Sequence, residues 1–156
     1  MLQQDMEVEA EGSSCSTSGA SKTLAAARTS TSHLIQVSLR LTEPPGLSCV
    51  CLQIPDGLDA KYSRVVAAHG DSVLIEVPHG HTIDHFVYSA GAAAADPPRP
   101  PSMSLLPPFR QGRPTGLVRR GVDLVVVAQL ASVSAGPDTP ELMRESDLCL
   151  FRSGDW

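Results

Sequence analysis

Hydrophobic and polar positions alternate along most of the chain beyond residue 33. In residues 34–41 (LIQVSLRL), Ile35, Val37, Leu39 and Leu41 alternate with polar residues, which is typical of a β-strand with one buried face. Further segments have the length and composition of strands: residues 47–54, 63–69, 72–77, 82–89, 116–119, 123–131 and 147–152. Because Gly- and Pro-rich breakers separate nearly all of them, the pattern predicts an all-β fold, an antiparallel meander of about eight short strands.

The connection between residues 63–69 and 72–77 is short enough to define a hairpin. Gly70 and Asp71 alone separate the two segments, and a Gly-Asp pair favours a two-residue turn because glycine tolerates a positive φ. In the register that follows, His69 opposes Ser72, and the pairs further back bring apolar residues together. We therefore expect one buried face formed by Val66, Ala68, Val73, Ile75 and Val77.

The chain divides into a tail and a body. Residues 1–32 combine alternating acidic residues with a Ser/Thr-rich tract, which predicts a disordered tail because such a segment buries little apolar surface. Residues 33–156 form the β-rich body, with a Pro/Ala-rich loop at 90–102. A short helix is expected around 139–145, where Thr139 is a candidate cap and Pro140 the first helical position.

Composition and charge narrow the range of partners. The chain has 156 residues, enough for one domain, and no run of about 18 apolar residues, so no membrane span is expected. The net charge is −5, but residues 97–122 contain five arginines and no acid, so this segment carries +5 and the remainder −10. A basic loop of this kind could contact phosphate, yet Phe109 is its one aromatic residue and no nucleic-acid motif surrounds it. Nucleic acid is therefore not an expected partner.

The start of the chain also bears on localisation. It lacks the basic and apolar regions of a secretory signal, and its acidic residues argue against an organelle transit peptide. We therefore expect the cytosol or the nucleus, where the four cysteines would be free thiols.

Four of the five histidines lie in residues 69–86 and raise the question of catalytic or metal chemistry. His69, Asp71 and Ser72 have the residue types of a catalytic triad, but adjacency does not supply the relay that a triad needs, so a hairpin turn is the favoured interpretation. His79 and His81 are close enough on a strand to share one zinc ion, whereas His85 would converge with His81 only on a helix. The surrounding residues, TIDHFVY, favour a strand, so no metal site is expected.

Two other motifs have alternative interpretations. Cys49 and Cys51 would point to the same face of a strand and could join a metal or redox site, but the favoured interpretation is a pair of small buried apolar side chains. The PPRPP run at 97–101 fits a polyproline ligand of an SH3-like partner, although such runs more often serve as linkers.

An ordered series of segments resembles one plant family. The series comprises ARTSTSHLIQVSLRLTEPPGLSCVCLQIPDG, VVAAHGDSVLIEV, DHFVYSA, SMSLLPPF, GLVRRGVDLVVVAQL and ESDLCLFRSGDW, between residues 27 and 156. Together they resemble the N-terminal portion of plant proteins, abundant in grasses, that carry the domain of unknown function 1618. The resemblance implies a β-rich body, an incomplete propeller-like arrangement similar to domains associated with F-box proteins, and no established catalytic residues. Family members continue beyond the SGDW segment, and their starts are less acidic, which predicts a truncated member.

These observations lead to one functional expectation and one alternative. We expect a non-enzymatic, β-rich protein-interaction module or a truncated member of its family, with no catalytic, cofactor-binding or metal-binding residues. Self-association through an unpaired strand edge is expected as well, because such edges template pairing. The alternative is a metal-dependent enzyme that uses the cluster of His79, His81 and His85.

Overall fold

The computed structural model describes residues 6–10, 22–43, 45–46, 48–56, 58, 61–108, 115–120, 124–132 and 146–152. For residues 6–10, 124–126, 130–132 and 146–147 the description covers the backbone alone. The described residues contain eleven strands and no α-helix, which confirms the all-β prediction.

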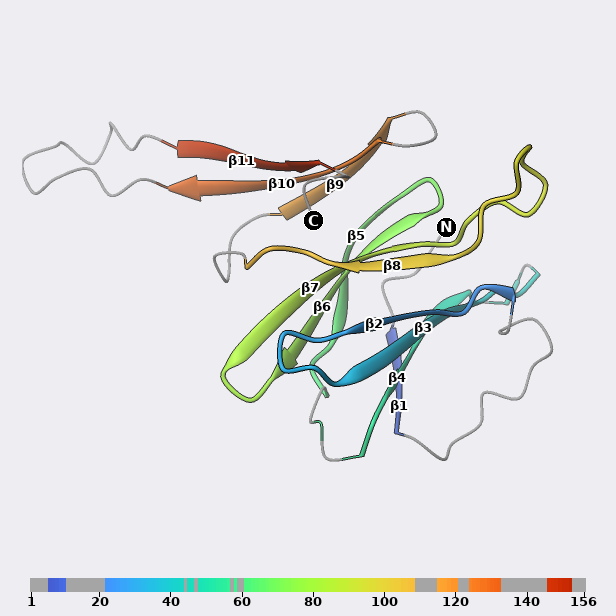
Figure 1. Ribbon diagram of the computed structural model, residues 1–156, viewed down its shortest axis with the longest axis horizontal. Coiled ribbons are helices and arrows are strands. Elements are labelled where there is room, and N and C mark those ends of the chain that lie inside the picture. The colour runs from blue at the N-terminus through green and yellow to red at the C-terminus, as the bar shows by residue number, and fades with distance from the viewer. Residues whose placement is uncertain are drawn as a thin grey trace, which may run out of the picture.

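The strands form three sheets (Figure 1). The first sheet contains β1 (Met6–Ala10), β2 (Ala25–Arg28), β3 (Leu34–Arg40) and β4 (Cys49–Ile54), in the order β1-β4-β3-β2. The central sheet is a meander of β5 (Arg64–His69), β6 (Ser72–His79), β7 (Thr82–Ser89) and β8 (Ser102–Leu105). The third sheet contains β9 (Thr115–Arg120), β10 (Leu124–Ser132) and β11 (Ser146–Arg152), in the order β11-β10-β9. All neighbouring strands are antiparallel except β1 and β4, which are parallel.

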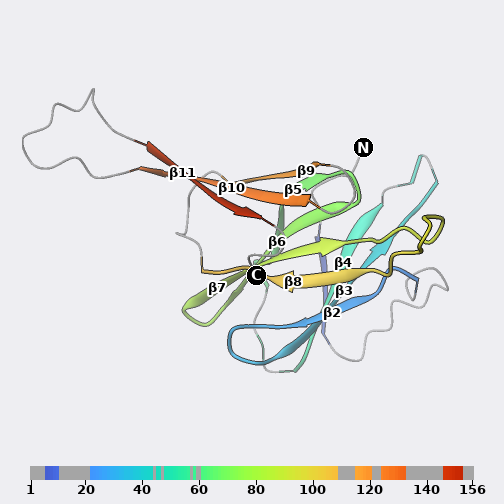
Figure 2. The same ribbon diagram turned by 45° about the horizontal axis from the view of Figure 1, so that its top comes forward.

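The three sheets are stacked, with the central sheet between the other two (Figure 2). On one face of the central sheet, Ile75 and Phe86 join a core cluster with Val37 and Leu52 of the first sheet. On the opposite face, Leu74 joins a second cluster with residues of the third sheet, among them Leu117 and Val127. The described strands leave the stack open, without a closed barrel, which is consistent with the predicted incomplete propeller-like arrangement.

The two-sided burial of the central sheet explains the composition of its middle strands. Val73, Leu74 and Ile75 follow one another in β6, and all three are buried although their side chains point to alternating faces. A strand covered on both faces needs apolar residues at consecutive positions, unlike the alternating pattern of β3. The continuous apolar run VLI in β6 therefore reflects its place in the middle layer.

The eight predicted strand segments are present, and the structure adds three strands to them. The added strands are β1, β2 and β8. The predicted tail over residues 1–32 contains two of these strands: Ala25–Arg28 pair with β3, and Met6–Ala10 pair with β4. Composition alone misses these pairings because a short strand gains its stability from the neighbouring strand and core. The helix expected around 139–145 lies outside the described residues.

The hairpin around Gly70 forms as predicted at its tip but contains a bulge further back. Gly70 has a φ of 63° and His69 pairs with Ser72, as expected for a two-residue turn that begins with glycine. The register then shifts between Val65 and Ala67, so Val65 rather than Val66 opposes Ile75.

The bulge changes which residues share the buried face. Val65 belongs to the core cluster with Val73, Ile75 and Val77, whereas Val66 packs against the cluster on the opposite face. Ala68 is exposed near the tip of the hairpin. The predicted buried face is therefore wrong at Val66 and Ala68 and holds for the three residues of β6.

The loop at residues 90–102 folds back on itself. The backbones of Ala92 and Arg99 exchange two hydrogen bonds, of 2.9 and 3.0 Å, and β8 begins at Ser102. Gly91, with a φ of 72°, lies against this segment, so closely that an added Cβ would be 2.4 Å from the carbonyl oxygen of Arg99. The PPRPP run is thus part of a folded loop in which the backbone of Arg99 is engaged internally.

Candidate functional site

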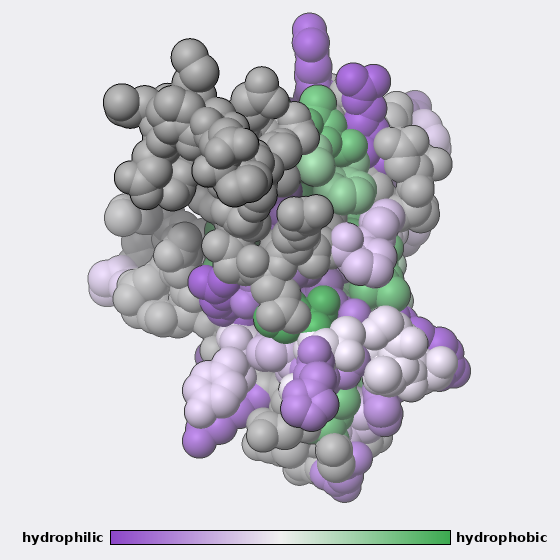
Figure 3. Space-filling model, turned by 90° about the vertical axis from the view of Figure 1, so that its left-hand side faces the viewer, coloured by the Kyte–Doolittle hydropathy of each residue, from purple (hydrophilic) through white to green (hydrophobic). Residues whose placement is uncertain are grey.

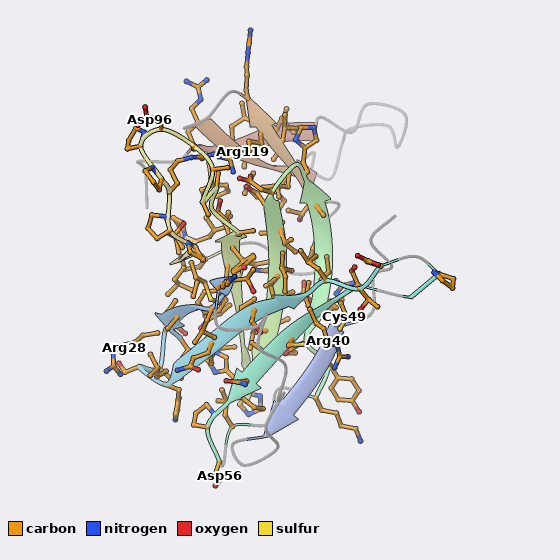
Figure 4. All side chains as sticks on the ribbon, turned by 90° about the vertical axis from the view of Figure 1, so that its right-hand side faces the viewer. Arg28, Arg40, Cys49, Asp56, Asp96 and Arg119 are labelled. Atoms are coloured by element: carbon orange, nitrogen blue, oxygen red, sulfur yellow. The ribbon has the colours of Figure 1, made fainter. Side chains whose placement is uncertain are left out.

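The turn of the first central hairpin forms a polar cluster with β9. The Nη1 group of Arg119 donates hydrogen bonds to a carboxylate oxygen of Asp71, to Ser72 Oγ at 2.9 Å and to Ser89 Oγ at 3.2 Å. The Arg119 side chain is 10% exposed, and a guanidinium offers several donors in a fixed geometry. Figure 4 labels Arg119 where the third sheet meets the end of the central sheet. Arg119 therefore links the two sheets.

Three further contacts complete this cluster. His69 Nδ1 accepts a hydrogen bond of 3.1 Å from the backbone N–H of Arg119. The Arg99 Nη2 atom lies 3.8 Å from the second carboxylate oxygen of Asp71, whose backbone carbonyl accepts a hydrogen bond from the N–H of Ala90. Asp71 thus joins the loop before β8 to the β9 strand.

The cluster has the residue types of a triad but not its arrangement. A nucleophilic serine needs a histidine base that is itself oriented by a carboxylate. Here Ser72 is fully buried and its hydroxyl donates to Asp71 at 3.3 Å, while His69 Nδ1 is engaged with the backbone of β9. The contacts are those of a hairpin turn anchored to a neighbouring sheet.

His79 lies in a second polar cluster at the opposite end of the central sheet. Its Nε2 atom is 2.9 Å from Asp84 Oδ2, and the same oxygen accepts a hydrogen bond of 2.7 Å from the backbone N–H of Ser30 in the β2–β3 turn. His79 and Asp84 are both buried. This cluster connects the first sheet to the central sheet, as does the hydrogen bond of 2.5 Å from the Tyr88 hydroxyl to the carbonyl of Thr23.

His85 faces the other side of the central sheet. It lies in a row with Glu76 and Arg64, which are cross-strand partners in β7, β6 and β5. The Glu76 carboxylate accepts hydrogen bonds of 2.9 and 3.1 Å from Arg64 and lies 3.3 Å from His85 Nε2. The opposite charges of Arg64 and Glu76, which directly oppose each other, stabilise the pairing of β5 with β6.

Burial and charge act in opposite directions on the pKa values in this row. Burial lowers the pKa of His85 below its ordinary value of 6.5, and this effect exceeds the opposing attraction of Glu76. Burial would raise the pKa of Glu76, but the hydrogen bond and charge of Arg64, with a contribution from His85, lower it overall. The hydrogen bond with Glu76 in turn raises the pKa of Arg64. The row is therefore held by an ionised Arg64–Glu76 pair beside a neutral His85.

The structure does not bring His79, His81 and His85 together. Along a strand successive side chains point to opposite faces, so His79, which pairs with Asp84 toward the first sheet, and His85, which pairs with Glu76, lie on opposite sides of the central sheet. His81 is exposed in the turn between β6 and β7. Among the residues that the structure describes, no group of three His, Cys, Asp or Glu side chains is placed to hold a metal ion.

The arginines of the basic segment at 97–122 lie in different environments in the fold. Arg99 and Arg119 are directed to Asp71, where their charge is partly neutralised. Arg120 is exposed, and Arg110 and Arg113 lie outside the described residues. Nothing in the local sequence distinguishes Arg119 from Arg120, so the role of Arg119 depends on the alternation of faces along β9 and on the stacking of two sheets.

The outer face of the third sheet exposes large apolar side chains. Val118, Leu148 and Leu150 are 53%, 61% and 47% exposed. Val118 and Arg152 both pair with Val126, and Leu150 pairs with Ala128, so these side chains share the face turned away from the central sheet. Figure 3 shows hydrophobic surface near the top of the molecule, at the level of the third sheet, with strongly hydrophilic side chains beside it.

Comparisons with known proteins identify no relative. No family model matches the chain, and no curated protein or solved structure is significantly similar to it. In the described part of the chain, no helix has the length and apolar character needed to cross a membrane.

Proposed function

We propose that the chain is a non-enzymatic protein-interaction module that binds its partner through the outer face of the third sheet. This proposal is based on the exposure of Val118, Leu148 and Leu150 together on that face. Contiguous apolar surface on a folded protein marks interaction sites more often than scattered single residues do.

The position of this face in the stack supports the proposal. Each face of the central sheet is covered by another sheet, which buries clusters that contain Ile75 on one side and Leu74 on the other. The third sheet has the same construction: Leu117 and Val127 point inward, and Val118 points outward. A further β-layer or an extended segment laid on this face would bury it in the way the inner faces are buried.

Charge defines the chemistry of the partner. Arg120 is an exposed residue of β9 two positions from Val118, so its side chain emerges on the same outer face, and Arg152 opposes Val126 there. Two guanidinium groups beside an apolar stripe favour a partner segment that combines apolar side chains with carboxylates. The same charges oppose the pairing of this face with a second copy of itself.

A selection from a random peptide library tests this function. The chain and its Leu148→Asp/Leu150→Asp variant are used as targets, because both leucines are exposed and the change leaves the core intact. We expect the wild-type chain to enrich peptides that alternate apolar and acidic residues, and the variant to lose them. Enrichment of the same peptides by both proteins, or dimerisation of the wild-type chain through this face in sedimentation, would contradict the proposal.

The family assignment and the localisation belong to the same proposal. We propose that the chain is a member of the plant family that carries the domain of unknown function 1618, on the strength of the ordered segments between residues 27 and 156. We also propose that it acts in the cytosol or the nucleus, where cysteines outside disulfides, such as Cys49 and Cys51, are usual. Fractionation of plant cells that express a tagged chain, with recovery in membrane or secreted fractions as the contrary result, tests the localisation.

A further inference from the structure

Two cysteines lie side by side on the outer face of the first sheet. Cys49 and Cys51 are separated by one residue in β4, and the side chains of positions i and i+2 share a face of a strand. Their Sγ atoms are 4.0 Å apart, and neither cysteine belongs to a disulfide. They do not share the face of Val50 and Leu52, which belong to the core cluster between the first and central sheets.

We propose that Cys49 and Cys51 form a two-coordinate thiolate site for a soft monovalent cation, Cu(I). Thiolate ligands select soft metals, whereas a structural zinc site requires four ligands. With metal–sulfur bonds of about 2.3 Å, one ion can join sulfur atoms up to about 4.6 Å apart, so the observed separation allows coordination without movement of the backbone. A disulfide would instead require the sulfur atoms to approach to about 2.05 Å.

The surroundings of the pair fit the charge of such a complex. Coordination converts two thiols and one Cu(I) ion into a bis-thiolate complex of charge −1 and releases two protons. Arg40 is the direct cross-strand partner of Cys49, and directly opposed side chains of an antiparallel pair are close neighbours. Figure 4 labels Arg40 and Cys49 beside each other on the first sheet. Arg40 therefore places a positive charge in the neighbourhood of the complex.

The two thiols differ in their exposure to solvent. Cys49 is partly exposed, so an ion delivered from solution can reach it first. Cys51 is fully buried and opposes Ser38, which is buried as well. A bound ion would thus be held between an accessible and a protected sulfur atom, which slows its loss and its oxidation. This inference is independent of the outer face of the third sheet.

Titration with Cu(I) under anaerobic conditions, in competition with a coloured Cu(I) chelator, tests the site. The chain has four cysteines, so a Cys15→Ser/Cys149→Ser variant retains the pair alone and serves as the positive control. We expect this variant to bind one Cu(I) per chain, with two sulfur neighbours in X-ray absorption spectra, and to reject Zn²⁺ in the same competition.

Removal of one thiol tests whether both sulfur atoms bind the ion. Cys49→Ser in the same background should weaken Cu(I) binding at least about 100-fold, since removal of a direct ligand costs no less than the 10- to 100-fold typical of supporting residues. Because Cys49 is partly exposed, its replacement leaves the core intact, and circular dichroism verifies the fold. Unchanged affinity in the folded Cys49→Ser variant, or a copper ion with fewer than two sulfur neighbours in the control, would overturn the proposal.

Discussion

Gly91 and Gly80 both adopt a left-handed backbone conformation, with φ angles of 72° and 59°, but their surroundings differ. A Cβ atom at Gly91 would meet the backbone of Arg99 and Pro100 at 2.4 to 2.7 Å, whereas a Cβ at Gly80 would meet nothing within 4 Å. The two positions therefore separate the cost of the backbone conformation from the cost of a steric clash.

Substitution of alanine for each of the two glycines should therefore cost different amounts of stability. Gly80→Ala should destabilise the chain by about 1 to 2 kcal/mol, the cost of a left-handed conformation for a residue with a Cβ. Gly91→Ala should cost distinctly more, because the backbone of the 90–102 loop must also move. Urea unfolding of both variants measures the difference, and equal losses would show that the loop does not pack against Gly91.

At the scale of the strand, the bulge in β5 decides which valine belongs to the core between the first and central sheets. Val65 is 8% exposed and belongs to that core, while Val66 is only partly buried and packs toward the third sheet. Val65→Ala should cost roughly 2 kcal/mol and Val66→Ala about half as much, because truncation costs most where packing is complete. A larger loss of stability for Val66→Ala than for Val65→Ala in chemical denaturation would contradict the bulge and support a strand with simple alternation.

The Arg64–Glu76–His85 row makes the stability of the central sheet dependent on pH. Since the folded-state pKa of His85 lies below its ordinary value of 6.5, the unfolded chain binds the proton more readily, and stability falls as the pH decreases through about 6.5. The lowered pKa of Glu76 adds a second loss of stability at more acidic pH, below its ordinary value of 4.5.

Replacement of His85 should remove the first of these two phases. We expect His85→Gln to flatten the thermal stability between pH 7 and pH 5.5, while the matched change at the exposed turn residue, His81→Gln, keeps the wild-type dependence. An unaltered slope in the His85→Gln protein would mean that burial of this imidazole is not linked to folding.

Sequence periodicity predicts single strands well and their interruptions poorly. The alternation in residues 34–41 and the glycine at position 70 act locally, so both β3 and the turn are foreseen. The bulge at Val66 is not, because Val65, Val66 and Ala67 are all compatible with either face. The pairing of β2 with β3 also depends on long-range packing that residues 25–28 alone do not display.

At the scale of the whole molecule, the stacking of sheets determines the chemistry of the histidine-rich segment. Sequence order places His79 and His85 near each other, but the sheet separates them to opposite faces, where each binds a carboxylate. No local signal predicts that Arg119 contacts Asp71, because that contact spans 48 residues and two sheets. The polar clusters therefore form only when the sheets stack, and their contacts link the sheets to one another.

Replacement of Arg119 tests whether this residue anchors the third sheet to the central sheet. Arg119→Ala removes the hydrogen bonds to Asp71, Ser72 and Ser89 and should destabilise the chain by about 2 kcal/mol, typical for hydrogen bonds to a charged group. The adjacent exposed Arg120→Ala serves as the control and should change stability little. Thermal unfolding compares them, and equal effects would indicate that the third sheet is not anchored through Arg119.

A hydrogen-exchange footprint tests whether the outer face of the third sheet is the surface through which the chain binds its partner. Amide exchange of the chain is measured with and without a library-selected peptide that binds it. We predict slower exchange in β9 (Thr115–Arg120) and β11 (Ser146–Arg152), with β3 (Leu34–Arg40) unchanged. Protection confined to the first sheet, with β9 and β11 unaffected, would contradict the account.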